Sequence, residues 1–300
     1  MDIIPEILFL GNGINRCFDN SIPWNTLLAG LSDGKYTPDD IAAISCPAPL
    51  KAILATGDKV DQRLKDKKAD LFGCTSVEQN SILQKLLDID FDEIFTTNYS
   101  YELEMAALNK TNITEKEIIK LSAHMPAVKK VEPKYLLHSY NSVNFKGKER
   151  HIWHIHGEAR KPDSMILGHY YYANLLAKEK TVMDSRRDSY KFDDFNPKSW
   201  LDSFILGNVY IIGFGFDLSE IDLWWMLNRK KREKASQGKT VFYDIFLKEM
   251  KEEDNKARET RNKLLDMLNV DVFPTETDKD GFIRCYNDTI DGIAEKLKRK

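Results

Sequence analysis

Short apolar runs that end in glycine or in a small polar residue recur along the chain and predict buried strands. Residues 7–10 are apolar throughout and lead directly into a Gly-Asn-Gly turn. Residues 91–97 show the same pattern at their core, and residues 209–212 end at a Gly-Phe-Gly turn. A continuous apolar run with a turn at its end is typical of a strand covered on both faces. We therefore expect these runs inside one sheet.

Helical patterns separate the strands. The clearest covers residues 76–88, where Ser76 can cap the first turn, Gln79 stands three residues later and four apolar side chains form one stripe. Ser219 is expected to cap a helix after the last glycine turn. Further helices are expected over residues 24–31, 39–56, 101–108, 171–180, 252–268 and 287–300, and further strands over residues 239–247 and 270–273. This alternation predicts an α/β fold, a doubly wound and mainly parallel sheet with helices on both faces.

Residues 109–149 interrupt the alternation. They are polar, mixed in charge and without a long hydrophobic period, and they end in a glycine-containing turn. We interpret them as a helical or irregular insertion within a single domain that spans residues 1–300.

A further strand is expected over residues 150–157, which end in His-Gly. Simple alternation would place Ile152, His154 and His156 on one face of this strand and its remaining apolar side chains on the other. A histidine in a strand is more often structural than catalytic, so this pattern alone is weak.

Composition narrows the function classes. The chain has 300 residues, of which 42% are hydrophobic, and a formal net charge of −3. A large core is possible, and no global basic field indicates nucleic acid as the main ligand. The four cysteines are scattered without a C-x-x-C pair, and no histidine pairs with a carboxylate at helical spacing, so we expect neither disulfides nor a metal site. No segment approaches the about 18 apolar residues of a membrane span, which favours a cytoplasmic protein.

The candidate chemistry lies where the predicted strands end. In a doubly wound sheet, ligands bind outside the carboxyl ends of the strands. Gly11 and Gly13 would let a phosphate approach the backbone, although Arg16 replaces the third glycine of the dinucleotide fingerprint and a turn without a ligand remains the alternative. Asn98 offers an amide to a ribose hydroxyl or a water, or else caps a helix, and His156 offers a base near neutral pH.

These motifs, in this order, resemble those of the sirtuins. Residues 11–15 are similar to the Gly-Ala-Gly-Ile-Ser element, 97–100 to Gln-Asn-Ile-Asp, 156–157 to the catalytic His-Gly, and 213–215 to the later Gly-Thr-Ser turn. The resemblance covers roughly residues 7–225. It is strongest to the bacterial sirtuin-like domains of antiphage defence, and it implies a Rossmann-like sheet that binds NAD+.

The resemblance also implies roles for individual residues. Gly11, Gly13 and Gly215 would cradle the NAD+ phosphates and ribose, Asn98 would hold the nicotinamide ribose or position water, and His156 would be the general base. The remaining NAD+-contacting residues that it implies are Asn12, Asn15, Thr97, Ser100, Gly157 and Gly213.

Two departures separate the chain from deacetylating sirtuins. Ser100 stands where those enzymes have an aspartate, and residues 158–208 contain no cysteine, so the zinc module is not expected. The resemblance therefore implies hydrolysis of NAD+ to nicotinamide and ADP-ribose in antiphage defence, as a homo-oligomer or under control of a partner such as an ATPase, a nuclease or a phage-derived trigger. A non-catalytic NAD+ or ADP-ribose sensor is the alternative, and an NAD-dependent deacylase is disfavoured.

Overall fold

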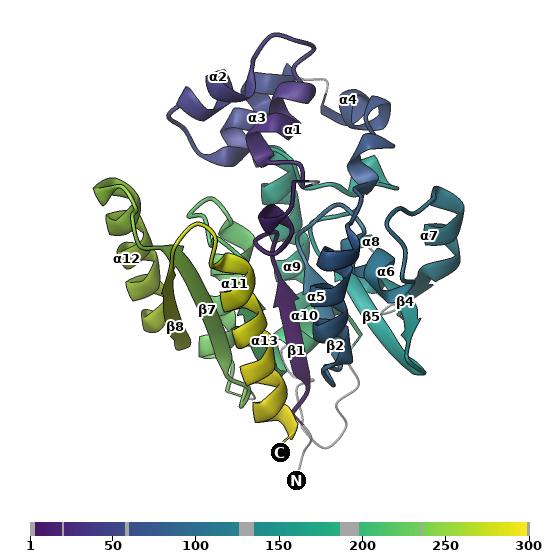
Figure 1. Cartoon of the computed structure of the whole chain (residues 1–300), viewed down its shortest axis with the longest axis vertical. Helices are drawn as coiled ribbons and strands as arrows, with labels where there is room; N and C mark the ends of the chain where they lie inside the picture. Colours follow the sequence, from purple (N-terminus) through teal and green to yellow (C-terminus); the bar gives the residue numbers. More distant parts are fainter. Residues whose placement is uncertain are drawn as a thin grey trace.

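The strands form one mixed sheet in the computed structural model. The structure describes residues 4–19, 21–57, 60–125, 135–186, 198–234 and 236–298. Within these residues the sheet has eight strands in the order β3-β4-β5-β2-β1-β6-β7-β8 (Figure 1). The strands are β1 Glu6–Leu10, β2 Glu93–Thr96, β3 Ser122–His124, β4 Ser139–Phe145, β5 Lys148–His154, β6 Asn208–Ile212, β7 Thr240–Leu247 and β8 Val270–Thr277. The α-helices are α1 Trp24–Gly30, α2 Pro38–Ala43, α3 Ala48–Thr56, α4 Val60–Asp66, α5 Val77–Asp88, α6 Glu102–Ala107, α7 Glu115–Leu121, α8 Tyr135–His138, α9 His169–Arg186, α10 Trp200–Leu206, α11 Ile221–Arg232, α12 Glu252–Met267 and α13 Phe282–Lys298.

The six strands from β5 to β8 in the sheet order run parallel, as the apolar runs predict. β1 lies in the centre between β2 and β6, so the three clearest runs are neighbours in the sheet. Because parallel strands end at the same edge, the turns after β1, β2, β5 and β6 meet there. The predicted α/β class and doubly wound, mainly parallel sheet are confirmed.

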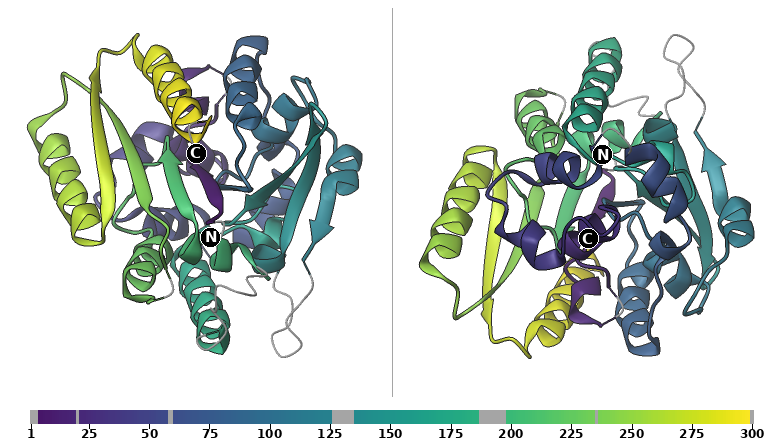
Figure 2. Two further views of the ribbon diagram at one scale, coloured as in Figure 1. Left: turned by 90° about the horizontal axis from the view of Figure 1, so that it is seen from below. Right: turned by 90° about the horizontal axis from the view of Figure 1, so that it is seen from above.

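Helices cover both faces of the sheet (Figure 2). In β1, Ile7 and Phe9 pack into one core with α9, α10 and α11, whereas Leu8 and Leu10 pack into the other core with α5, α6 and α13. The alternation of side chains along a strand explains this division. Both faces of the central strand are therefore buried, which accounts for its continuous apolar run.

Helices α1 to α4 form a cap over the carboxyl-end edge of the sheet (Figure 1). Their apolar side chains, among them Leu28, Ile41 and Leu64, build a third core with Met105 of α6 and Leu167. The helix predicted over residues 39–56 is two helices, α2 and α3, because proline at position 47 has no backbone N–H and disfavours helical geometry at the residue before it.

Two other local predictions are wrong. The segment 109–149 is not only helical and irregular, since it contributes β3 and β4, which pair antiparallel at the sheet edge. Lys146 and Gly147 both have positive φ in the hairpin between β4 and β5, as a two-residue hairpin turn requires. Ser219 does not cap α11, because its hydroxyl donates to Asp217 at 2.5 Å and the N-cap position is Glu220.

Among the helices in the described ranges, none has both the length and the apolar character needed to cross a bilayer.

Candidate functional site

The turns after β1 and β6 pack directly against each other. The Gly11 amide donates to the carbonyl of Ile212 at 2.9 Å, and the Gly13 amide donates to that of Gly213 at 2.7 Å. A Cβ on Gly11 would lie 2.3 Å from the Gly213 oxygen, and one on Gly13 would lie 2.7 Å from the Gly213 Cα. The glycines that the sequence assigned to phosphate binding are therefore also required by the contact between the two turns.

Gly215 differs from the other glycines of these two turns. It is exposed, and a Cβ placed there would meet nothing within 4 Å. Its carbonyl accepts a hydrogen bond from Arg261 at 3.0 Å. Since no contact among the described residues demands glycine at this position, Gly215 is the glycine of these two turns that a ligand could approach most closely.

The asparagines of the first turn form a hydrogen-bonded row. Asn15 is buried and donates to Asn12 at 2.9 Å, and Gln79 at the start of α5 donates to Asn15 at 3.0 Å. This row joins the turn after β1 to the helix that precedes β2.

The turn after β2 is held through its backbone. The Asn98 amide donates to the Thr96 hydroxyl at 3.1 Å, and its carbonyl accepts from Nδ1 of His154 at 2.7 Å. The other ring nitrogen of His154 donates to Glu104 at 2.9 Å. Thr97, the residue between, is half-buried. The position of Asn98 is therefore set by β5 and α6 as well as by its own strand.

A narrow pocket lies beside Asn98, and in the observed conformation it has no room for a water molecule. Its lining residues are Leu10, Asn15, Leu83, Thr96, Asn98, Ser100, Glu102, Leu103 and Glu104. Three predicted site residues, Asn15, Asn98 and Ser100, are thus brought together. Pockets that hold small ligands usually measure about 300–1,000 Å³, so this pocket would have to widen before any part of a dinucleotide could enter it.

Ser100 lines the pocket together with Glu102. Its hydroxyl donates to Glu102 at 2.5 Å, and Glu102 is buried. Burial raises the pKa of Glu102, an effect that the hydrogen bond from Ser100 opposes. A carboxyl group therefore stands next to the serine that replaces the sirtuin aspartate.

His156 lies on the opposite side of the sheet from His154, so the predicted shared face is wrong. β5 ends at His154, and the chain then turns, with Gly157 at φ +92°. A Cβ on Gly157 would lie 2.2 Å from the Ser164 carbonyl oxygen. The turn directs His156 toward α9 and α11, whereas His154 faces α6.

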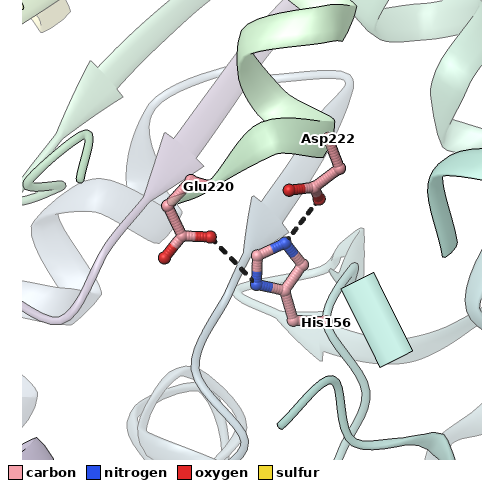
Figure 3. Close-up of side chains that lie close together, drawn as sticks. All are labelled: His156, Glu220 and Asp222. Carbon is pink, nitrogen blue, oxygen red and sulfur yellow. Dashed lines mark hydrogen bonds and ion pairs between the residues drawn. The ribbon is translucent and has the colours of Figure 1, made fainter. Parts of the chain in front are cut away.

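The imidazole of His156 lies between two carboxylates at the start of α11 (Figure 3). Nε2 donates to Oδ2 of Asp222 at 2.7 Å, and Nδ1 is 3.8 Å from Oε2 of Glu220. The Tyr172 hydroxyl donates to the same Glu220 oxygen at 3.0 Å. His156 and Asp222 are buried, and the Glu220 side chain is 20% exposed.

These carboxylates change the proton affinity of His156. Burial alone would lower its pKa, but the charge of Asp222, the hydrogen bond to it and the charge of Glu220 together raise the pKa above its ordinary value. Burial raises the pKa of Glu220, which the charge of His156 opposes. The imidazole is therefore stabilised in its protonated form.

The same three side chains could hold a cation, since one ligand atom from each lies within 4.8 Å of the others. However, Figure 3 shows Asp222 and Glu220 at different ring nitrogens, and one imidazole offers a single nitrogen to a given ion. Glu179 of α9 is buried nearby, and neither of its carboxylate oxygens has a hydrogen-bond partner among the residues that the structure describes. The geometry resembles a hydrogen-bonded network more than a coordination sphere.

The structure thus assembles two groups of predicted residues. One surrounds Asn98, and the other holds His156, which is absent from the lining of the narrow pocket. Sequence reasoning missed Glu102, Glu220 and Asp222. The available signal was a pair of acidic residues two apart at the start of the helix after β6, the position that faces the strand ends.

Comparison with known families gives one match. A family model described as a SIR2-like domain matches residues 92–273. This range contains Asn98, His156 and Asp222 but leaves out β1 and its glycine turn. No curated protein matches the chain.

Proposed function

This chain belongs to the SIR2-like domain family, and from that premise we propose that it hydrolyses NAD+ to nicotinamide and ADP-ribose. Family membership supports an NAD-related role, and the hydrolytic reaction is the step beyond it. We further propose that residues 1–300 act as one NAD-binding catalytic domain.

The observation that carries this proposal is that an asparagine with an anchored backbone and a histidine with an anchored ring both stand at the carboxyl-end edge of the sheet. Asn98 is anchored through His154 and lines the narrow pocket, and His156 is anchored through Asp222. An amide can hold a ribose hydroxyl or orient water, and an imidazole can accept a proton. The Asn98 backbone and the His156 ring are each held by a hydrogen bond, which favours a defined position toward a substrate.

Cleavage of NAD+ requires few further catalytic groups. Cleavage of the bond between nicotinamide and ribose passes through an oxocarbenium-like state, as glycoside cleavage does. Nicotinamide leaves as a neutral molecule, so acid catalysis of its departure is not required. The remaining tasks are to hold the ribose and to orient one water molecule, which fit Asn98 and His156.

The glycine turns would take the rest of the dinucleotide. Gly215 has free space around it, so it is the best candidate to approach a phosphate. Gly11, Gly13 and Gly213 would shape the turn, because the amides of Gly11 and Gly13 already donate to the carbonyls of Ile212 and Gly213. Asn12, Asn15, Thr97, Ser100 and Gly157 complete the proposed NAD+ site. No step of this mechanism requires a metal ion.

A non-catalytic sensor of NAD+ or ADP-ribose is the second candidate. Two observations favour it: the pocket beside Asn98 is narrow, and both sides of the His156 ring face carboxylates. A site in this conformation could register occupancy without turnover. By the resemblance to antiphage proteins, we propose that assembly or a partner protein opens the site in the catalytic case.

Product analysis separates the two candidates. Purified wild-type protein is incubated with NAD+, and separately with NADP+, and the products are resolved by chromatography. We expect nicotinamide and ADP-ribose from wild type, and a loss of about 100-fold or more in Asn98→Ala and His156→Gln. The control is His124→Ala, an exposed histidine on the edge strand β3, which should leave the rate unchanged.

Unchanged rates in both site variants would remove these residues from the mechanism. Binding of NAD+ without any product, with or without added partner, would favour the sensor.

A glycine pair tests the binding half of the proposal. Gly215→Ala should weaken NAD+ binding while leaving the thermal midpoint unchanged, because the added methyl has free space in the unliganded chain. Gly11→Ala should instead lower the midpoint, since its Cβ would lie 2.3 Å from a carbonyl oxygen. Equal NAD+ affinity in wild type and Gly215→Ala would exclude a close approach of the ligand at Gly215.

A further inference from the structure

The two nitrogens of His156 have unequal surroundings. Nε2 donates a hydrogen bond to Oδ2 of Asp222 at 2.7 Å, and the Asp222 side chain has no exposed surface. Nδ1 faces Glu220, whose side chain is 20% exposed, at 3.8 Å, which is too long for a hydrogen bond. Nδ1 is therefore the nitrogen on the more open side of the cluster.

We propose that Asp222 is a positioning residue for His156, holding Nε2–H so that Nδ1 is the nitrogen that takes up a proton. This inference rests on the proposed function. In the reaction, the water oxygen bonds to the ribose carbon, one water proton passes to Nδ1, and the electron pair of the broken bond leaves with nicotinamide. The proton on Nδ1 is then released to solvent.

Asp222 suits this role because its own position is buried and rigid. It lies in the first turn of α11, next to Leu223, which packs into the core on this face of the sheet. An aspartate that receives Nε2–H fixes the orientation and tautomer of the ring and stabilises the imidazolium. Glu220 cannot serve in the same way, because the Tyr172 hydroxyl donates to its oxygen and the distance to the ring is longer.

Several other titratable groups face this cluster. Tyr172 and Glu179 approach from α9, and Tyr99 approaches from the segment after β2. Burial, followed by the negative charges of the cluster, raises the pKa of all three. Both tyrosines are therefore uncharged near neutral pH, and the charge that acts on His156 comes mainly from Asp222 and then Glu220.

The charge of Asp222 sets the pH at which His156 becomes neutral. Asp222 raises the pKa of His156, so the neutral ring that can accept a proton appears only as pH rises through that raised value. Replacing the carboxylate by an amide removes the charge, lowers the pKa of His156 and shifts the acidic limb of the pH–rate profile to lower pH.

The test compares Asp222→Asn, Glu220→Gln and wild type in kcat, KM and pH profile. We expect Asp222→Asn to lower kcat by about 10-fold to 100-fold, part of the usual contribution of acid–base catalysis, with KM little changed and the acidic limb moved to lower pH. Glu220→Gln should give a smaller shift in the same direction. Asp217→Asn is the matched control, because Asp217 is exposed on the same connection and bonds Ser219 rather than His156.

A second readout needs neither activity nor a variant. Side-chain NMR of wild-type protein labelled with ¹⁵N-histidine reports which ring nitrogen carries the proton above the titration of His156. We expect the Nε2–H tautomer, and the Nδ1–H tautomer would overturn the role of Asp222. An unmoved acidic limb in folded Asp222→Asn would also overturn it. If wild type makes no nicotinamide at all, the proposed hydrolysis fails, and the tautomer still decides the positioning.

Discussion

Two histidines at the end of β5 are only two residues apart, yet their side chains lie on different sides of the sheet. His154 uses both ring nitrogens as donors, one to the Asn98 carbonyl and one to Glu104. His156 uses one nitrogen for Asp222 and keeps the other beyond hydrogen-bond reach of Glu220. A histidine with two buried acceptors is a structural link, whereas one with a single tight acceptor retains a nitrogen for chemistry.

Carboxylates raise the pKa of both rings, in opposition to burial. The shift in pKa therefore does not distinguish a catalytic histidine from a structural one. The number and geometry of the hydrogen bonds do.

The same substitution at both positions should separate these roles most strongly. Glutamine can keep the Nε2 donor, so His156→Gln retains the bond to Asp222 and loses only Nδ1. We expect turnover to fall about 100-fold with little change in stability. His154→Gln keeps the bond to Glu104 but releases the Asn98 carbonyl, which should lower the free energy of unfolding by about 1–2 kcal/mol.

Steady-state rates and urea unfolding curves of both variants check this prediction. A larger loss of turnover in His154→Gln than in His156→Gln would reverse the assignment of the two histidines.

Gly157 separates the two histidine environments, and Gly157→Ala should disturb both. The residue has φ +92°, and its Cβ would lie 2.2 Å from the Ser164 oxygen. Backbone strain of this kind costs about 1–3 kcal/mol before the clash is added. Thermal unfolding measures the loss, and Gly30→Ala serves as control because a Cβ there meets nothing within 4 Å. Equal thermal midpoints for wild type and Gly157→Ala would show that the turn can rearrange.

Stability should also depend on pH through both histidines. Their folded pKa values are raised, so their contribution is fully present below the unfolded value of about 6.5 and is lost as pH rises through the folded values. Urea unfolding at pH 6 and pH 9 should show lower stability at pH 9. The difference should shrink in His154→Gln and in His156→Gln, and an unchanged difference in both would assign it to other groups.

The smallest effect is expected at Glu179. Its carboxyl group is buried, and within the described part of the chain neither oxygen has a hydrogen-bond partner. Burial, followed by the charge of Asp222, raises its pKa well above the ordinary value. Glu179→Met keeps the volume and removes the buried polar group, so we expect unfolding to require about 1 kcal/mol more. Denaturant titration at pH 7 measures this change. A clear destabilisation would reveal a role for Glu179 within the His156 cluster.

Periodicity along the chain predicted most of the sheet. The strands around residues 7–10, 91–97 and 209–212 lie side by side in the centre of the sheet, and their apolar cores are typical of strands buried on both faces. β4 was not predicted, because it lacks such an apolar run. It lies next to the edge strand, and its serines and asparagines alternate with few apolar side chains, so its pattern matches that of a polar loop.

The candidate site was predicted in part. Asn15, Asn98 and Ser100 do line one pocket, as their positions at strand ends suggest. The side of His156 was predicted wrongly, because alternation holds only while the chain remains extended and β5 ends two residues earlier. The roles of all these residues in binding or catalysis stay predictions.

The sequence by itself determined the α/β class, the central parallel strands and the edge of the sheet where polar residues gather. These features follow from local periodicity and from the rule that parallel strands end together. Only the tertiary structure decided which carboxylate meets which histidine. Asp222 and His156 are 66 residues apart, and their contact depends on how α11 packs against the turn after β5. Such pairings depend on the packing of whole elements, which no local pattern encodes.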